Sequence, residues 1–131
     1  MDPIANSFTQ IKNALNASQK EVYLSYSKLK LAILATLKHR GLIEDFKEEK
    51  SDEQKYPKIK VVLKYKVNRE AAFTNIRRVS RPGRRVYLAT DKIAAAKRGK
   101  IDIILSTSQG VMSGTEAKAK GLGGEVIGEV V

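Results

Sequence analysis

Five arginines lie within nine consecutive residues of the chain, and no acidic residue separates them. They flank the Pro-Gly pair at positions 82 and 83, and they are Arg77, Arg78, Arg81, Arg84 and Arg85. A guanidinium group stays charged at neutral pH and donates two parallel hydrogen bonds to a phosphate. The segment therefore predicts contact with a polyphosphate such as nucleic acid. The alternative is a solvated hairpin without a partner.

A second segment offers hydroxyl and amide groups instead of charge. Ser106, Thr107 and Ser108 are followed by Gln109 and Gly110. A loop with these groups can donate to and accept from base edges, sugar hydroxyls and phosphates, the mixture that irregular RNA presents. Loops rich in serine and threonine are common, so this segment alone is a weak signal.

The residue types needed for catalysis or metal binding are scarce. The chain has one histidine, His39, and no cysteine. Thiolate zinc sites, disulfides and cysteine nucleophiles are thereby excluded, and Ser106–Ser108 lacks a partner histidine to activate it. The glycines of Gly121–Gly124 do not complete a dinucleotide-binding fingerprint, because Val126 occupies the third glycine position. We expect no enzyme, no cofactor, no bound metal and no small-molecule substrate.

The composition supports a polyanionic partner. The chain has 131 residues, 42% of them hydrophobic, and carries a net charge of +11. A field of that sign attracts nucleic acid, although a basic balance can also serve solubility alone. No apolar stretch approaches the ~20 residues that span a bilayer, and the N-terminus lacks the features of a signal peptide. We expect a cytoplasmic protein without membrane contact.

The elements that position these residues can be read from the apolar pattern. Asp2 before Pro3 predicts a helix start, and the apolar residues that follow recur at helical spacing through Leu15. Ser27 predicts the start of a second helix, which ends at Gly41. Short strands are expected at 22–24, 42–46 and 59–65, with a polar loop at 51–57. Residues 1–66 therefore predict an α-β-α-β-β module.

The remaining chain predicts a second, β-rich module over residues 67–131. Strands at 76–80 and 84–88 would form a hairpin around the Pro-Gly turn, and a loop at 106–110 would follow a strand at 101–105. Residues 91–97 predict a short helical turn. Ser113 and Glu116 form a capping box that begins a short helix, and 125–131 predicts the last strand. The expected fold is α+β, with the two modules packed together.

Three segments of the C-terminal half and two of the N-terminal half resemble one family, bacterial small-subunit ribosomal protein eight. They are RRVSRPGRRVY (77–87), ILSTSQGVMS (104–113) and KAKGLGGEVIGEV (118–130), preceded in order by DPIANSFTQIKNAL (2–15) and SYSKLKLAILATLKHRGLIEDF (25–46). The resemblance covers nearly the whole chain. It implies a primary binder of 16S-type ribosomal RNA, at a helix of the central domain, that promotes assembly of the small subunit.

The resemblance also implies which residues bind RNA. Ser106, Thr107 and Ser108 would contact a distorted RNA helix, with Tyr87 nearby and Gly123, Gly124 and Glu125 on the same surface. Arg81 and Arg84 would contact phosphate. A further contact would come from the N-terminal helices, where the candidates on charge grounds are Lys12, Lys28 and Lys30.

The chain departs from the family pattern at three places. Gln10 and Lys12 stand where members often carry two arginines, Asp102 interrupts an apolar strand, and Gly114 and Thr115 begin a helix unusually. The partners implied are ribosomal RNA and neighbouring small-subunit proteins, and the chain's own messenger RNA is an open addition. The alternative is a general nucleic-acid-binding protein without a ribosomal role.

Overall fold

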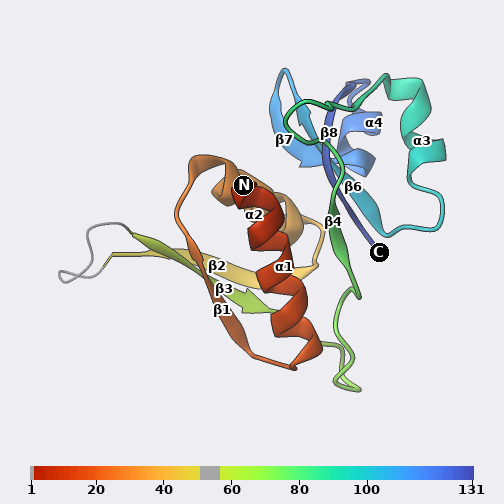
Figure 1. Ribbon diagram of the computed structural model, residues 1–131. Coiled ribbons are helices and arrows are strands. Elements are labelled where there is room, and N and C mark those ends of the chain that lie inside the picture. The colour runs from red at the N-terminus through yellow and green to blue at the C-terminus, as the bar shows by residue number, and fades with distance from the viewer. Residues whose placement is uncertain (1, 51–56) are drawn as a thin grey trace.

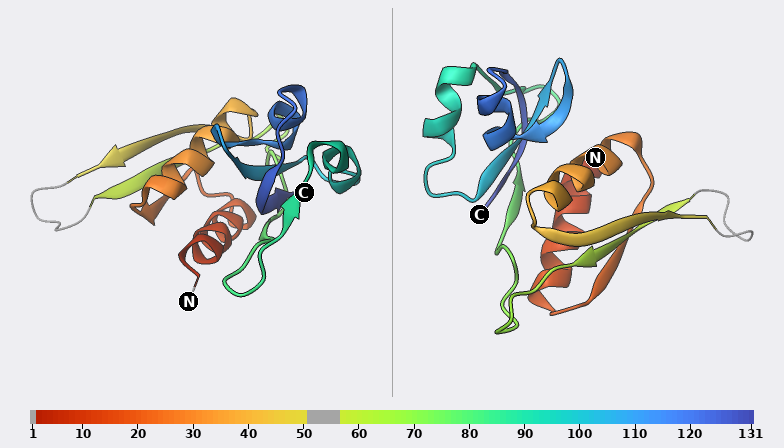
Figure 2. Two further views of the ribbon diagram at one scale, coloured as in Figure 1. Left: turned by 90° about the horizontal axis from the view of Figure 1, so that it is seen from above. Right: turned by 180° about the vertical axis from the view of Figure 1, so that it is seen from behind.

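The computed structural model describes residues 2–50 and 57–131. The predicted polar loop at 51–57 lies almost entirely outside this range. The described chain forms two antiparallel sheets with helices between and beside them, as Figures 1 and 2 show. This arrangement confirms the α+β fold class.

The first sheet has the strand order β1-β3-β2. Its strands and the two long helices are α1 (Pro3–Asn16), β1 (Glu21–Ser25), α2 (Lys28–His39), β2 (Ile43–Glu49) and β3 (Lys58–Leu63). Both predicted helix starts are confirmed. The Asp2 carboxylate accepts from the backbone N–H groups of Ile4 and Ala5, and the Ser27 hydroxyl accepts from that of Lys30. These caps satisfy N–H groups that have no partner inside a helix.

The second sheet is built around the last strand, β8. Its elements are β4 (Ile76–Arg78), β5 (Tyr87–Leu88), β6 (Asp102–Thr107), β7 (Gly110–Ser113) and β8 (Gly124–Val130). The strand order is β4-β8-β6-β7, and β5 also pairs with β8. A 3₁₀ turn at Thr90–Lys92 leads into α3 (Ile93–Ala96) between β5 and β6, and α4 (Gly114–Ala119) precedes β8.

The arginine-rich segment is not the hairpin that the sequence predicted. β4 and β5 each pair antiparallel with β8, so they run in the same direction and do not pair with each other. The chain leaves the sheet after Ser80, turns through a backbone bridge between Arg81 and Arg84, and returns at Val86. We call the excursion Arg81–Arg85 the arginine loop.

The predicted loop at 106–110 is also corrected. Ser106 and Thr107 belong to β6, and Gly110 begins β7, a strand that the sequence pattern did not predict. Only Ser108 and Gln109 remain as the turn between them. Further along, the Ser113 hydroxyl accepts from the Glu116 N–H at 3.1 Å as predicted.

Two buried clusters hold the layers together. One lies on α1 and α2 and includes residues from both sheets, among them Phe8, Leu34, Val61, Ile104 and Ile127. The other fills the space between the second sheet and the helices α3 and α4. Because the first cluster crosses residue 66, the two halves share one core. The module boundary at 66 and 67 stays a prediction.

Asp102 links the two halves through charge. Its side chain is 2% exposed, and its Oδ2 lies 2.7 Å from Nε of Arg40, at the end of α2. The same carboxylate accepts from the hydroxyl of Thr115 at 2.7 Å and from the N–H of Ile103 at 2.8 Å, and Lys97 lies 3.7 Å away. The unusual residues Asp102 and Thr115 are therefore partners of each other.

These partners set the pKa of Asp102. Burial alone raises the pKa. The hydrogen bonds from Thr115, Ile103 and Arg40, together with the charge of Lys97, lower it by more than burial raises it, so the net pKa lies below its usual value. A lowered pKa in the folded state means that the stabilisation is fully present above the pKa of an unfolded aspartate. The stabilisation is then lost as the pH falls through the folded value.

We predict that Asp102→Ala lowers the free energy of unfolding by about 3 kcal/mol, because Arg40 and several N–H and O–H donors lose a buried acceptor. Urea unfolding at neutral pH measures this loss. The same titration repeated down to pH 3 should show a steeper loss of stability for the wild type than for Asp102→Asn. Thr115→Val, which removes one hydrogen bond, is the control and should cost about 1 kcal/mol. Parallel pH profiles for the wild type and Asp102→Asn would contradict the assignment.

Candidate nucleic-acid interface

Three predicted site residues lie side by side on three neighbouring strands. Tyr87 of β5 pairs with Glu125 of β8, and Glu125 pairs with Ser106 of β6. Residues directly opposite on antiparallel strands project to the same face of a sheet. We call these three residues the three-strand row. It presents a phenol, a carboxylate and a hydroxyl in a line across the sheet.

The row continues the face of the second sheet that packs on α1 and α2. Ser106 lies two residues beyond Ile104 on β6, so both side chains project to the same side. Ile104 is buried against the helices, whereas Ser106 is only half-buried and Tyr87 is 69% exposed. The row therefore emerges from the core at one edge of the molecule, near the turn between β6 and β7 at the top of Figure 1.

The two glycines of the predicted site have a structural role. A Cβ at Gly124 would lie 2.2 Å from the carbonyl oxygen of Ser106, and a Cβ at Gly123 would lie 2.4 Å from that of Leu88. Side chains at these positions are excluded by the protein's own backbone. The glycines let β8 approach its neighbours closely and so bring Glu125 into line with Tyr87 and Ser106.

The three hydroxyls at the end of β6 are not equivalent. The Thr107 hydroxyl donates to the carbonyl of Gly110 at 2.8 Å and accepts from the N–H of Gln109 at 3.1 Å. It therefore shapes the turn. Within the described residues, the side-chain hydroxyls of Ser106 and Ser108 form no hydrogen bond, so they are available to a ligand.

The five arginines of residues 77–85 divide into two groups. Three of them contact acidic residues: Arg77 with Glu129 at 2.9 Å, Arg78 with Asp2 at 3.0 Å, and Arg85 with Glu125 at 3.5 Å. Arg81 and Arg84 are exposed and have no ion pair with any described residue. The contact of Arg85 with Glu125 ties the arginine loop to the three-strand row. The two free guanidinium groups therefore stand on a loop attached to the row.

Sequence reasoning missed the residue that closes this loop. Ser80 is fully buried, and its hydroxyl accepts from the N–H of Val86 at 2.9 Å and donates to the carbonyl of Val86 at 3.3 Å. These two bonds hold the ends of the loop together. A serine directly before Arg81 and Pro82 was the available signal, because serine hydroxyls often bond nearby backbone groups at turns.

The three lysine candidates of the N-terminal half lie on α1 and α2 and not on the strands of the row. Lys28 is exposed at the start of α2, and Lys12 is half-buried on α1. Lys30 is only 5% exposed, so its prediction as a surface contact does not fit the structure. Its ammonium group donates to the hydroxyl and the carbonyl of Ser25, at 2.7 and 3.2 Å. Charge counting failed here because it treats every lysine as exposed.

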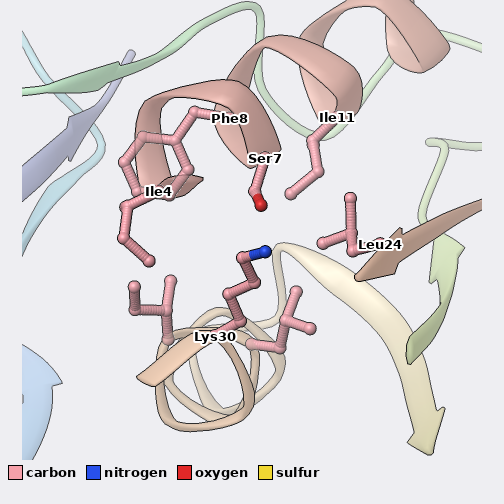
Figure 3. A pocket seen from close by; sticks show the side chains of 8 residues that line it. Ile4, Ser7, Phe8, Ile11, Leu24 and Lys30 are labelled. Atoms are coloured by element: carbon pink, nitrogen blue, oxygen red, sulfur yellow. The ribbon is translucent and has the colours of Figure 1, made fainter. Parts of the chain in front are cut away.

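Lys30 lines a small internal cavity between α1 and α2. Figure 3 shows its ammonium group and the Ser7 hydroxyl pointing toward one another among Ile4, Phe8 and Leu24. The cavity volume is about 10 Å³, room for at most one water molecule. Burial lowers the pKa of Lys30. The chain therefore keeps one lysine inside its core.

The described chain contains no helix long and apolar enough to cross a membrane. Over residues 2–50 and 57–131 there is also no group of three or more histidine, cysteine, aspartate or glutamate side chains that could hold a metal ion.

Comparison with known proteins matches the chain to one family over nearly its full length. The model of the family "Ribosomal protein S8" matches residues 2–131. The chain belongs to the ribosomal protein S8 family. The resemblance inferred from the motifs is thereby confirmed. The S8 family consists of structural ribosomal proteins, so the prediction that the chain is not an enzyme is confirmed as well.

Individual relatives agree with this assignment. A protein of Nitrosomonas europaea named small ribosomal subunit protein uS8 is 45% identical over 126 residues, which cover 96% of this chain and 94% of the relative. Proteins of the same name from Caldicellulosiruptor bescii and Acholeplasma laidlawii are 42% and 40% identical, over 97% and 98% of this chain and 95% and 96% of theirs.

We predict that Lys30→Met leaves RNA affinity unchanged, because the side chain lies in the core of this S8-family member. Its stability should match or exceed that of the wild type at neutral pH, since replacing a buried charge by an apolar group of similar size is often neutral or stabilising. Because folding lowers the pKa of Lys30, wild-type stability should also rise as the pH approaches 10, and Lys30→Met should lack this rise. Lys28→Met, the same change at an exposed position, is the matched control for RNA binding. Weaker RNA binding by a stable Lys30→Met protein would contradict the structural role.

Proposed function

We propose that the chain is a structural constituent of the small ribosomal subunit and binds 16S-type ribosomal RNA at the three-strand row and the arginine loop. The observation that carries this proposal is the row itself, in register across three strands and joined through Arg85 to a loop with two arginines that form no ion pair within residues 2–50 and 57–131. Family membership supplies the ribosomal context.

The row is suited to recognition of an irregular RNA helix. The available hydroxyl of Ser106 can donate and accept, the carboxylate of Glu125 accepts from amino groups or 2′-hydroxyls, and the exposed ring of Tyr87 can stack on a base or sugar. RNA sequence is read mainly where bases are unstacked or splayed, since the major groove of a regular RNA helix is too narrow for side chains. A rigid row of mixed donors and acceptors fits such a site.

The arginine loop supplies affinity in this proposal. Arg81 and Arg84 have no internal partner among the described residues, so no existing ion pair must break when they meet phosphate. Phosphate contacts position a protein on RNA without reading its sequence. In the rival function, general nucleic-acid binding, the arginines contact the nucleic acid and the row does not. The two proposals therefore differ in which residues matter.

The cellular setting follows from the same proposal. A protein bound to small-subunit RNA resides in the cytoplasm on the ribosome, and it promotes subunit assembly by holding the RNA helix in its bound shape. Neighbouring small-subunit proteins are then its protein partners. A messenger that folds like the ribosomal site would offer the same chemistry to the row. Binding of the chain's own messenger is therefore compatible with the site and belongs to this proposal.

We expect the double substitution Ser106→Ala and Ser108→Ala to weaken binding to a folded central-domain RNA fragment by about 30-fold, because each lost hydroxyl contact contributes about 1 kcal/mol. Filter binding measures the affinity. Thr107 is avoided because its hydroxyl shapes the turn, and circular dichroism checks the fold. Binding to duplex DNA at the same salt should be unaffected. Equal losses on both nucleic acids would favour the general-binding alternative.

The arginine loop should act mainly through salt-dependent affinity. Replacing Arg81 and Arg84 together by glutamine should weaken RNA binding and reduce the slope of log affinity against log salt by about 1.5, because two phosphate contacts are lost. Lys92→Gln with Arg98→Gln, at two exposed positions beside α3, removes the same number of charges outside the arginine loop and is the matched control. A slope unchanged from the wild type would remove the arginine loop from the interface.

A further inference from the structure

A basic pocket lies beyond the C-terminal end of α1, and we call it the second pocket to distinguish it from the one at the N-terminal end. Its volume is about 400 Å³, and its lining residues are Ser18, Lys20, Tyr65 and Arg69. At the N-terminal end of α1, the N-cap residue Asp2 lines a surface pocket of about 410 Å³ together with Arg81 and Pro82. The 14 residues of α1 rise by about 20 Å. The helix therefore separates two basic pockets, and Figure 1 shows it running from the arginine end down to the segment before β4.

The cations of the second pocket have no internal partner. Lys20 and Arg69 are exposed and make no ion pair with any residue in the described part of the chain. The neighbouring acid Glu21 is already paired with Lys60 at 3.3 Å. Glu70, the one acid of the turn that carries Arg69, lines a different pocket together with Lys66. The pocket is therefore electropositive.

Backbone strain is concentrated at the same place. Among the described residues, Ser18 (φ 54°) and Arg69 (φ 69°) are the two that adopt positive φ without being glycine. Both line the second pocket. A residue with a side chain costs more than glycine in this conformation, and residues held there cluster at functional sites. A hydroxyl and a guanidinium group are thus kept at two positions where glycine would fold more easily.

Tyr65 connects the two strained segments. Its hydroxyl donates to the carbonyl oxygen of Gln19, directly after Ser18, and its backbone bridges to Ala71, after the turn of Arg69. Burial raises the pKa of Tyr65, so the phenol keeps its proton at neutral pH. The phenol oxygen can still accept a hydrogen bond. The pocket thus combines two cations, a hydroxyl and a fixed phenol, a set that binds a phosphate oxygen through charge-assisted hydrogen bonds.

We propose that this pocket binds a backbone phosphate of a second segment of RNA, about 20 Å along α1 from the arginine loop. The inference rests on the proposed function, because it takes RNA as the ligand. It goes beyond that function by making the protein a bridge between two RNA segments. Lys20 and Arg69 contact the phosphate, Ser18 donates its hydroxyl, and Tyr65 holds the two segments in place.

The test compares a short RNA with a long one. The double variant Lys20→Gln and Arg69→Gln should bind the isolated central-domain fragment like the wild type, because the three-strand row is intact. On full-length small-subunit RNA its salt slope should fall by about 1.5, the value for two lost phosphate contacts. Hydroxyl-radical footprinting should show two protected RNA patches with the wild type and one with the variant. The matched control is Lys92→Gln with Arg98→Gln, which removes one lysine and one arginine beside α3.

A glycine variant separates strain from binding. Arg69→Gly should unfold at the same or a higher urea concentration than the wild type, because glycine adopts a positive φ without strain, and it should still lose the second footprint. A second footprint that persists in both Arg69 variants would overturn the inference. Loss of the second footprint in the control variant as well would also overturn it. The same holds if the double variant keeps both RNA footprints but no longer binds an acidic neighbouring protein. Failure of the proposed function would look different, since the wild type itself would protect no ribosomal RNA.

Discussion

The close approach of β8 to its neighbours on both sides is the constraint on which the second sheet depends. β8 pairs with β6 along one edge and with β4 and β5 along the other. A Cβ at Gly124 would meet the Ser106 carbonyl, and a Cβ at Gly128 would lie 2.7 Å from the carbonyl of Arg77 and 2.8 Å from the ring of Phe8. The first glycine aligns the three-strand row, and the second lets α1 pack against the sheet. The alignment of the three-strand row and the shared core thus both depend on glycines in a single strand.

The sequence predicted those features whose causes are local. Asp2 and Ser27 each cap the helix that follows them within three residues, so the pattern of neighbours was sufficient. The hairpin around Pro82 failed because the strands on either side of it pair with β8, about forty residues later in the chain. The polar residues at 106 and 107 predict a loop from local sequence alone, whereas pairing with β8 and β7 keeps them extended.

The candidate site was predictable in type but not in arrangement. The motifs named Ser106, Tyr87 and Glu125 as site residues, but their alignment in one row is a property of the sheet register. A surface position is the expectation for Lys30, because a lysine is almost never fully buried without a partner. The hydroxyl and carbonyl of Ser25, brought close by the turn between β1 and α2, supply that partner.

The shared core fixes the distance between the two pockets. Two contacts on one RNA strengthen each other only if the distance between them matches the distance between their sites, because the second contact then forms at a high effective concentration. A flexible linker would lower that concentration by spreading the distances. Here one pocket lies beyond each end of α1, and the helix is held on both sides, by β1 and by β4. The helix is thus a spacer of fixed length, and an RNA that fits both ends must present its two segments at that separation. If both proposals hold, the protein selects one relative position of two RNA segments, which is what assembly of a folded RNA requires.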